Sequence, residues 1–381
     1  MNRRKFLAIA GGGVILAAGA AVGLRVTRTP QTAFLPWEQA GSLYDEPRRK
    51  ALSYAILAPN PHNRQPWIVD LSQPDIVVLT ADQNQLLPHT DPNNRQITVG
   101  LGCFLELMSM AAAREGYRVE MKLFPNGSDP EKLDERVVCE ARFVHDPAVL
   151  KDQLFDHVLT RRSFKEPFDM SRKVTQSVVD QIAGAAVHGN RAKGSNDAEH
   201  VAQLRDLTRE ALMVEFNTPR TYKESVDLFR IGAPEVDANP DGIDLAGPFM
   251  ETLALTGGMS RELALDPNSM AFSEGKKMVA EQCETAMAHV WLASPGNSRV
   301  DQINAGRDWV RMNLAAASLG IGIHPMSQCL QEFPEMAKWY EAVHHKLAKP
   351  QETVQMLARL GYGESIAPSP RWPLEKKIKQ G

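Results

Sequence analysis

The segment Ala58-Pro59-Asn60-Pro61-His62-Asn63-Arg64-Gln65-Pro66-Trp67 gives the clearest indication of the fold. Its three prolines exclude a regular helix and a central strand, because proline lacks the backbone N–H that both structures use. The side chains between the prolines include three carboxamides, and each carboxamide offers both a donor and an acceptor. We therefore predict a stiff loop that can bind the edge of a flat polar heterocycle, with Trp67 packed in the core behind it.

Composition indicates a globular protein. The chain has 381 residues, of which 43% are hydrophobic and 23% charged, enough for one large core or two smaller ones. The net charge is −3 and the pI about 6.4, and neither a basic domain nor a stacking motif indicates a nucleic-acid surface. The four cysteines are far apart and form no C-x-x-C pair, so we expect small core residues instead of a disulfide or metal site.

The N-terminus resembles a twin-arginine export signal. Arg3-Arg4-Lys5-Phe6-Leu7 precedes an Ala/Gly-rich apolar run that ends at Leu24. We expect residues 1–28 to lie outside the fold. The resemblance implies that the twin-arginine translocase exports the folded protein to the periplasm or to the outer face of the inner membrane. A Sec signal, or a membrane anchor through residues 6–24, is the alternative.

Hydrophobic periodicity predicts alternating helices and strands. For the first helix, Asp45 is the expected N-cap and Pro47 fits the first turn. The Gly-, Pro- and Asp-rich segment 228–259 predicts a long loop, which we interpret as a lid. The predicted helices are 45–57, 95–115, 147–160, 173–186, 198–217, 270–286 and 301–319, and the predicted strands are 67–71, 75–80, 117–124, 136–144 and 288–293.

The two long helices at 95–115 and 301–319 indicate an internal repeat. Both end at a glycine and lead into a strand, and matching residues are separated by 204 positions. The matching pairs are Gly102 and Gly306, Gly116 and Gly320, Val99 and Ile303, Val119 and Ile323, and the alanines 111–113 and 315–317. We predict two related halves at 35–150 and 151–381. Two unrelated helices that happen to end at glycine are the alternative.

Three further segments contain candidate binding residues. Arg161-Arg162-Ser163 would suit a dianionic phosphate, although a solvated basic pair has the same sequence. The run from Leu319 to Ser327 contains a G-x-G turn between a helix and a strand. Near the C-terminus, Leu360-Gly361-Tyr362-Gly363 is followed by Arg371-Trp372-Pro373-Leu374-Glu375.

Together with the proline loop, these segments resemble the FMN-dependent nitroreductase family. Asn60 stands where the family usually has serine, and Lys165 stands where its second basic residue is expected. The resemblance implies FMN as the cofactor, with its phosphate on Arg161, Arg162, Ser163 and Arg371. It also implies that the flavin ring edge lies on Asn60, Asn63 and Gln65, flanked by Pro59 and Pro61, and that the backbone of Met326 and Ser327 lies beside flavin N5.

The order of the motifs is similar to that of a branch of the family in which two halves are fused. Typical members are homodimers whose flavin lies between subunits, whereas here the proline loop precedes Arg161 by almost a hundred residues. The resemblance therefore implies an α+β nitroreductase-like fold of two related halves, fused as a pseudo-dimer. The second half has no Q-P-W loop, so we expect at most one FMN per chain.

The function implied is reduction of a small electron acceptor, such as a nitro compound or a quinone, through flavin N5. This chemistry belongs to the cofactor, so no catalytic side chain is named. NAD(P)H is scarce outside the cytoplasm, and a protein that binds or sequesters FMN without turnover is therefore the alternative. An exported solute-binding protein without a cofactor is a third interpretation.

Overall fold

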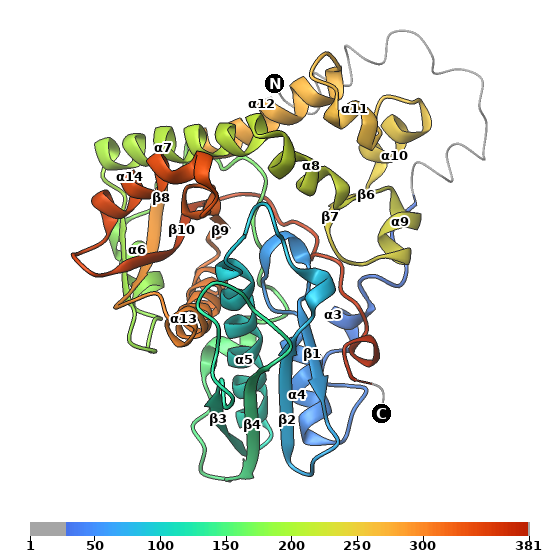
Figure 1. The fold of residues 1–381 in the computed structure, drawn as a ribbon, viewed down its shortest axis with the longest axis vertical. Helices are drawn as coiled ribbons and strands as arrows, with labels where there is room; N and C mark the ends of the chain where they lie inside the picture. The colour runs from blue at the N-terminus through green and yellow to red at the C-terminus, as the bar shows by residue number, and fades with distance from the viewer. Residues whose placement is uncertain (1–27, 380–381) are drawn as a thin grey trace.

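The computed structural model describes residues 28–379, which form an α+β fold with two antiparallel four-stranded sheets and a central pair of long helices (Figure 1). The α+β class predicted from the sequence is therefore confirmed. The predicted export signal lies outside the described residues, apart from Arg28.

The first sheet belongs to the N-terminal part of the chain and has the strand order β1-β2-β4-β3. Burial alternates from residue to residue in β2 and β3, because one face of the sheet lies on the core and the other faces solvent. Its elements are α4 (Pro47–Ala55), β1 (Trp67–Asp70), β2 (Ile76–Ala81), α5 (Arg95–Arg114), β3 (Tyr117–Leu123) and β4 (Val137–His145).

The second sheet has the equivalent order, β5-β8-β10-β9. Every residue of β8 is buried, because helices cover this sheet. Its elements are α6 (Gln176–Ala183), β5 (Arg191–Ser195), β8 (Ala288–Ser294), α13 (Arg299–Ser318), β9 (Gly322–Pro325) and β10 (Thr353–Gly361). The sequence of elements, helix-strand-strand-helix-strand-strand, is thus the same as in the first sheet once insertions are set aside.

Helices α5 and α13 cross at two glycines. A Cβ atom on Gly102 would lie 3.0 Å from Gly306 Cα and closer still to the Ile303 carbonyl oxygen. A Cβ atom on Gly306 would lie 2.9 Å from Gly102 Cα and closer still to the Val99 carbonyl oxygen. The contact is reciprocal, as in an interface around a twofold axis.

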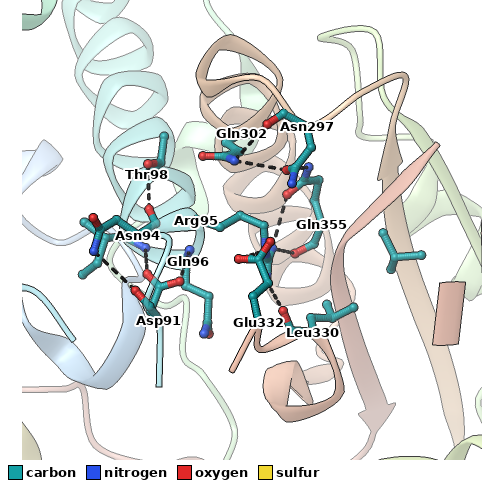
Figure 2. Close-up of polar contacts among 12 residues, drawn as sticks. Asp91, Asn94, Arg95, Gln96, Thr98, Asn297, Gln302, Leu330, Glu332 and Gln355 are labelled. Carbon is teal, nitrogen blue, oxygen red and sulfur yellow. Dashed lines mark hydrogen bonds and ion pairs between the residues drawn. The ribbon is translucent and has the colours of Figure 1, made fainter. Parts of the chain in front are cut away.

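A buried arginine at the start of each of these helices makes a further reciprocal contact between the two parts of the chain. From α5, Arg95 donates to the carbonyl oxygens of Gln355 and Leu330, at 2.8 Å each (Figure 2). From α13, Arg299 donates to the carbonyl oxygen of Asp129 at 3.0 Å and to Thr98 Oγ1 at 3.3 Å. Each arginine therefore satisfies polar groups of the opposite part of the chain.

The end of the chain returns to the first sheet. Val69 of β1 donates to the Lys377 carbonyl oxygen and accepts from Lys379 N–H, both at 2.8 Å. The C-terminal segment that follows β10 thus crosses from the second sheet to the first.

Residues 196–287 form an insertion between β5 and β8, which lies as an arc across the top and right of the molecule (Figure 1). The predicted loop at 228–259 is wrong, because this segment contains short regular elements, three of which directly follow a glycine. The insertion comprises α7 (Ala198–Asn217), α8 (Pro219–Asp227), β6 (Phe229–Ile231), α9 (Ala233–Ala238), β7 (Ile243–Leu245), α10 (Pro248–Leu255), α11 (Arg261–Leu265) and α12 (Met270–Glu284).

Other sequence predictions also need correction. Glu46, not Asp45, caps α4, because Pro47 is its first residue and the side chain just before it reaches the free N–H groups. Only the short 3-10 turn Gln153–His157 forms within the helix predicted at 147–160. The strands β5 and β10 and the short helix α8 were not predicted as separate elements. The remaining helices are α3 (Leu35–Gln39) and α14 (Ala337–Leu347).

Two predictions about burial are confirmed. Trp67 is fully buried, and all four cysteines are buried free thiols. Among the described residues, α5 is the one helix long and apolar enough to cross a membrane, but most of it is buried in the protein, which identifies a core helix.

Candidate functional site

The proline loop is held in an unusual backbone conformation. His62, Asn63 and Gln65 all have positive φ angles, of 46°, 52° and 51°. Such angles are costly for residues other than glycine and persist only when surrounding contacts impose them. Asn60 supplies one such contact, because its Oδ1 accepts a 2.7 Å hydrogen bond from Gln65 N–H. The loop is therefore rigid, as expected from its sequence.

The amides of Asn63 and Gln65 bind protein groups. Asn63 Nδ2 donates to the Pro370 carbonyl oxygen at 2.9 Å, and its Oδ1 accepts from Arg371. Gln65 is fully buried, donates to the Pro240 carbonyl oxygen at 2.7 Å and accepts from Trp372 N–H at 2.9 Å. These amides thus hold the loop to the C-terminal segment and the insertion, which leaves Gln65 unable to face a ring edge in this conformation.

The Arg161–Ser163 turn lies against this loop. Arg161 Nη2 donates to the Leu57 carbonyl oxygen at 3.2 Å, and Arg371 Nη2 donates to the same oxygen at 3.1 Å. The loop and the turn, a hundred residues apart in sequence, thus meet at the end of α4. The structure brings together Pro59, Asn60, Pro61, Asn63, Gln65, Arg161, Arg162, Ser163 and Arg371.

Three guanidinium groups gather around one tryptophan. The centre of the Trp37 ring lies 5.9, 5.1 and 5.4 Å from the guanidinium carbons of Arg161, Arg162 and Arg371. Within residues 28–379, none of the three forms an ion pair with a carboxylate. Burial, together with the charge of Arg162, lowers the pKa of Arg161 to about 10. The cluster is therefore an uncompensated positive charge inside the protein.

Arg371 does not fit its predicted role as a phosphate ligand. Its Nε donates to the Ile56 carbonyl oxygen at 2.8 Å, and its Nη2 donates to those of Leu57 and Ala58. Its Nη1 donates to Asn63 Oδ1 and to the Pro370 carbonyl oxygen, so all five N–H bonds are used. Arg371 instead binds the backbone carbonyl groups of the turn that directly follows α4.

Arg161 has the opposite character. It is only 3% exposed, and its Nε and Nη1 atoms are buried without a hydrogen-bond partner among the described residues. Buried donors of a charged group are costly when unsatisfied, so an anion at this place would stabilise the fold. Ser163 is half-buried next to Arg162 in the same turn.

Met326 and Ser327 follow β9, which the turn also contacts. Phe164 N–H donates to the Ile323 carbonyl oxygen of β9 at 2.9 Å. Met326 N–H already donates to the Leu357 carbonyl oxygen at 2.7 Å, so it is not free to bind a flavin. Ser327 N–H, at the start of a 3-10 turn, has no backbone acceptor among the described residues and remains a candidate.

A second group of polar side chains, which lies beyond the Arg161–Ser163 turn, comprises Lys165, His62 and His324. The Lys165 side chain is exposed, yet surrounding protein lowers the pKa of its ammonium group, against the opposing effect of the Asp244 carboxylate. Burial and the charges of Lys165 and Arg64 lower the pKa of His62 to about 4. His324 of β9 also has a strongly lowered pKa, because of burial and the charges of Arg359 and Lys165.

The corresponding place beside the second sheet is occupied by ion pairs. The α6–β5 connection corresponds to the proline loop, and its Ala185 carbonyl oxygen accepts from Arg311 Nε at 2.9 Å. Arg311 and Arg307 pair with the buried Glu106 at 3.0 and 2.9 Å, and His188 lies 3.0 Å from the same carboxylate. The hydrogen bond from His188 and these charges outweigh burial and lower the pKa of Glu106 to about 2. Positive charge is therefore neutralised here, unlike at Trp37.

Sequence reasoning missed Trp37 and Arg359. Trp37 lies in a short helix with no motif, so its sequence gave no signal. Arg359 was detectable in principle, because it is the one charged residue between Thr353 and Gly361 in a strand that is otherwise apolar apart from Gln355.

Comparison with known proteins supports the nitroreductase resemblance. No family model matches the chain. A putative NAD(P)H nitroreductase (acg) of Mycobacterium tuberculosis is 32% identical over 120 residues, which are 32% of this chain and only 35% of that protein. A second putative NAD(P)H nitroreductase of the same organism is 21% identical over 345 residues, or 87% of this chain and 90% of that protein. These two relatives show that the chain is similar in sequence to proteins of the nitroreductase family.

Solved structures are only distantly similar. A putative nitroreductase from Anabaena variabilis has a TM-score of 0.42 and 13% identity, over 92% of this chain and 93% of that chain. The FMN-dependent nitroreductase NfnB from Mycobacterium smegmatis, solved with NADPH, has a TM-score of 0.38 and 16% identity, over 60% of this chain and 98% of that chain.

Proposed function

We propose that the chain is an FMN-dependent oxidoreductase of the nitroreductase type that reduces a small acceptor through flavin N5. The observation that supports this most directly is the buried guanidinium cluster around Trp37, in which two nitrogen atoms of Arg161 have no hydrogen-bond partner among the described residues. A dianionic phosphate supplies the missing charge and acceptors.

The described residues fit FMN in part. Arg161, Arg162 and Ser163 would hold the phosphate, and Ser327 N–H would face the ring. The Asn60 side chain, which accepts from Gln65 N–H and donates to the Ala58 carbonyl oxygen at 3.1 Å, would shape the loop beside the ring. Bound there, FMN would supply hydride and electron transfer. The contribution of the chain is to bind and orient the cofactor on a rigid loop. Arg371 and Asn63 support that loop from behind instead of contacting the ligand.

We further propose that the fold arose as a fused pseudo-dimer with halves at 35–150 and 151–381. The equal order of elements and the reciprocal contact at Gly102 and Gly306 support this. Because Glu106 neutralises the corresponding arginines on the opposite side, one flavin is expected per chain.

Two measurements test the proposal. Flavin released from the purified protein should approach one per chain, and two per chain would contradict the single site. The Arg161→Met, Arg162→Met double variant should lose flavin, since each charge-assisted contact to the phosphate contributes about 1.5–3 kcal/mol, or tenfold or more in affinity. A control with Arg118→Ala and Arg136→Ala, both in exposed ion pairs, should retain it. Full occupancy in the Arg161, Arg162 variant would reject the phosphate assignment.

Sequestration of FMN without turnover is the second candidate. The insertion packs directly on the proline loop through the Arg64–Asp241 ion pair at 3.5 Å and the Gln65–Pro240 hydrogen bond, which favours a covered site and a lid role for residues 228–259. Under anaerobic conditions, bleaching of the flavin by NADPH would favour the enzyme. A spectrum that dithionite also leaves unchanged would favour sequestration.

Export is a separate proposal that depends on residues 1–28 alone. The twin-arginine motif supports a location in the periplasm or at the outer face of the inner membrane, with the translocase as partner. Cell fractionation of the native protein and of an Arg3→Lys, Arg4→Lys variant tests it, because the variant should remain in the cytoplasm.

A further inference from the structure

A carboxylate of the insertion holds the segment of chain that leads into α3. Asp237 in α9 accepts hydrogen bonds from three consecutive backbone N–H groups, those of Gln31, Thr32 and Ala33, at 2.8, 2.8 and 3.0 Å. The Thr32 hydroxyl donates to the same carboxylate at 3.0 Å. Hydrogen bonds to a charged acceptor are roughly twice as strong as neutral ones. Asp237 therefore latches this segment of the chain to the insertion.

The latched segment carries Trp37 to the buried arginine cluster. Helix α3 begins at Leu35, just beyond the latch. Trp37 is buried in this helix, and its Nε1 donates to the Ser369 carbonyl oxygen at 2.8 Å. Within the latched segment, the Ala33 carbonyl oxygen accepts from Arg371 N–H, also at 2.8 Å. The position of the Trp37 ring is thus fixed by the C-terminal segment on one side and by the insertion on the other.

The ring holds like charges together. The guanidinium carbons of Arg161, Arg162 and Arg371 lie 5.9, 5.1 and 5.4 Å from its centre. The electron-rich face of an aromatic ring attracts cations and so offsets part of their mutual repulsion. Arg161 depends most on the ring, because its side chain makes one hydrogen bond within residues 28–379, to the Leu57 carbonyl oxygen.

We propose that Asp237 is a positioning residue for the phosphate site and acts through Trp37. The carboxylate latches the chain before α3, and the latch keeps the ring where it holds the arginines ready for an anion. Attachment of the insertion and preorganisation of the anion site are then one event. The inference rests on the proposed function and deepens it, because it names the residues that couple the insertion to the affinity for phosphate.

Competition between FMN and riboflavin tests this role, because the two flavins differ only in the phosphate group. The full chain as purified is dialysed to equilibrium against both, and the composition of the bound flavin gives the ratio of the two affinities. Asp237→Asn should lower the FMN-to-riboflavin ratio by about tenfold. A general loosening of the fold would weaken both flavins alike and leave the ratio unchanged.

Glu224→Gln is the matched control. Glu224 also ties the insertion to the rest of the chain, because it accepts from the N–H groups of His89 and Thr90 at 2.9 and 2.8 Å. It makes no contact with the latched segment, so its variant should keep the ratio. An unchanged ratio in Asp237→Asn, or an equal fall in Glu224→Gln, would overturn the inference and leave FMN binding intact.

Variants of Trp37 test the path from Asp237 to the arginines. Trp37→Leu should lower the ratio by a similar factor, whereas Trp37→Phe, which keeps an aromatic face, should lower it less. Because Asp237 acts through the ring, Asp237→Asn should add little in the Trp37→Leu background. Full additivity of the two changes would contradict this path.

Reaction of Arg161 with phenylglyoxal, followed by peptide mass mapping, tests the latch without flavin binding. Arg161 is 3% exposed, so it should react slowly in the native chain, severalfold faster in Asp237→Asn, and at the native rate in Glu224→Gln. If the chain binds no flavin but Arg161 shows this pattern, the proposed function is rejected and the latch stands. If Arg161 reacts equally in all three proteins, the latch is rejected.

Discussion

The crossing of α5 and α13 allows a quantitative test of the fold. In Gly102→Ala, the added methyl group would lie 3.0 Å from Gly306 Cα, whereas carbon atoms in contact normally lie about 3.5–4.0 Å apart. Its other neighbours are atoms of the Ile303 backbone, which cannot rotate away as a side chain can. The clash with the Ile303 carbonyl oxygen is more severe still, so the helices would have to separate by more than about 1 Å along their whole contact.

Overpacking of this kind typically costs about 1–3 kcal/mol. Because backbone meets backbone here, we expect the upper end, about 3 kcal/mol, which exceeds the roughly 1 kcal/mol that alanine gains over glycine in a helix. Gly306→Ala should cost a similar amount. The double variant should cost less than the two single variants together, since one separation of the helices relieves both clashes.

The matched control is Gly275→Ala in α12, where no atom lies within 4 Å of the added methyl group. It should raise stability by up to about 1 kcal/mol. Thermal and urea unfolding of the variants would measure the differences. If Gly102→Ala were as stable as Gly275→Ala, the close crossing of the two helices would be refuted.

Three further predictions concern single side chains. Burial raises the pKa of Glu215 to about 7, so the folded state binds the proton more tightly and the free energy of unfolding falls as pH rises from about 4.5 to about 7. Glu215→Gln should remove this loss, and urea unfolding should show a gain of at most about 3 kcal/mol at pH 8 and little gain at pH 4.5. A gain independent of pH would contradict the assignment. Asn63→Leu should destabilise the fold as well as flavin binding, because it removes an acceptor of Arg371 and a donor to Pro370, and an unchanged melting temperature would argue against these contacts. Asp241→Asn should leave Arg64 and Arg230 without their carboxylate partner, which should lower the free energy of unfolding by about 3–5 kcal/mol and speed proteolysis of the insertion. Asp227→Asn, which removes a carboxylate from an exposed ion pair, should have neither effect.

Local features were predictable from the sequence. The two long helices end at Gly116 and Gly320, which have positive φ angles of 79° and 65°, as residues at such ends require. The alternation of buried residues located most strands of the first sheet within a few residues. The prolines fixed the stiff loop before Trp67. These features depend on periodicity and backbone chemistry within a short stretch.

The segment 228–259 was harder to predict, because its elements are short and rely on packing. β6 and β7 have three residues each and pair with each other, and Asp241 between them is held by Arg230 and Arg64. A sequence rich in glycine and proline is compatible with a loop until such distant partners are known.

The sequence by itself determined which chemistry is available: a rigid amide-rich loop, paired arginines and a class of fold. Only the tertiary structure decided how each donor is used. Arg161 and Arg371 have the same side chain, yet every N–H group of Arg371 binds a protein oxygen, at Asn63, at Pro370 or in the turn after α4, while Nε and Nη1 of Arg161 have no hydrogen-bond partner among the described residues. The physical reason is that a long charged side chain reaches acceptors from any segment that packs near it, and the identity of those acceptors is set by how distant segments of the chain pack together.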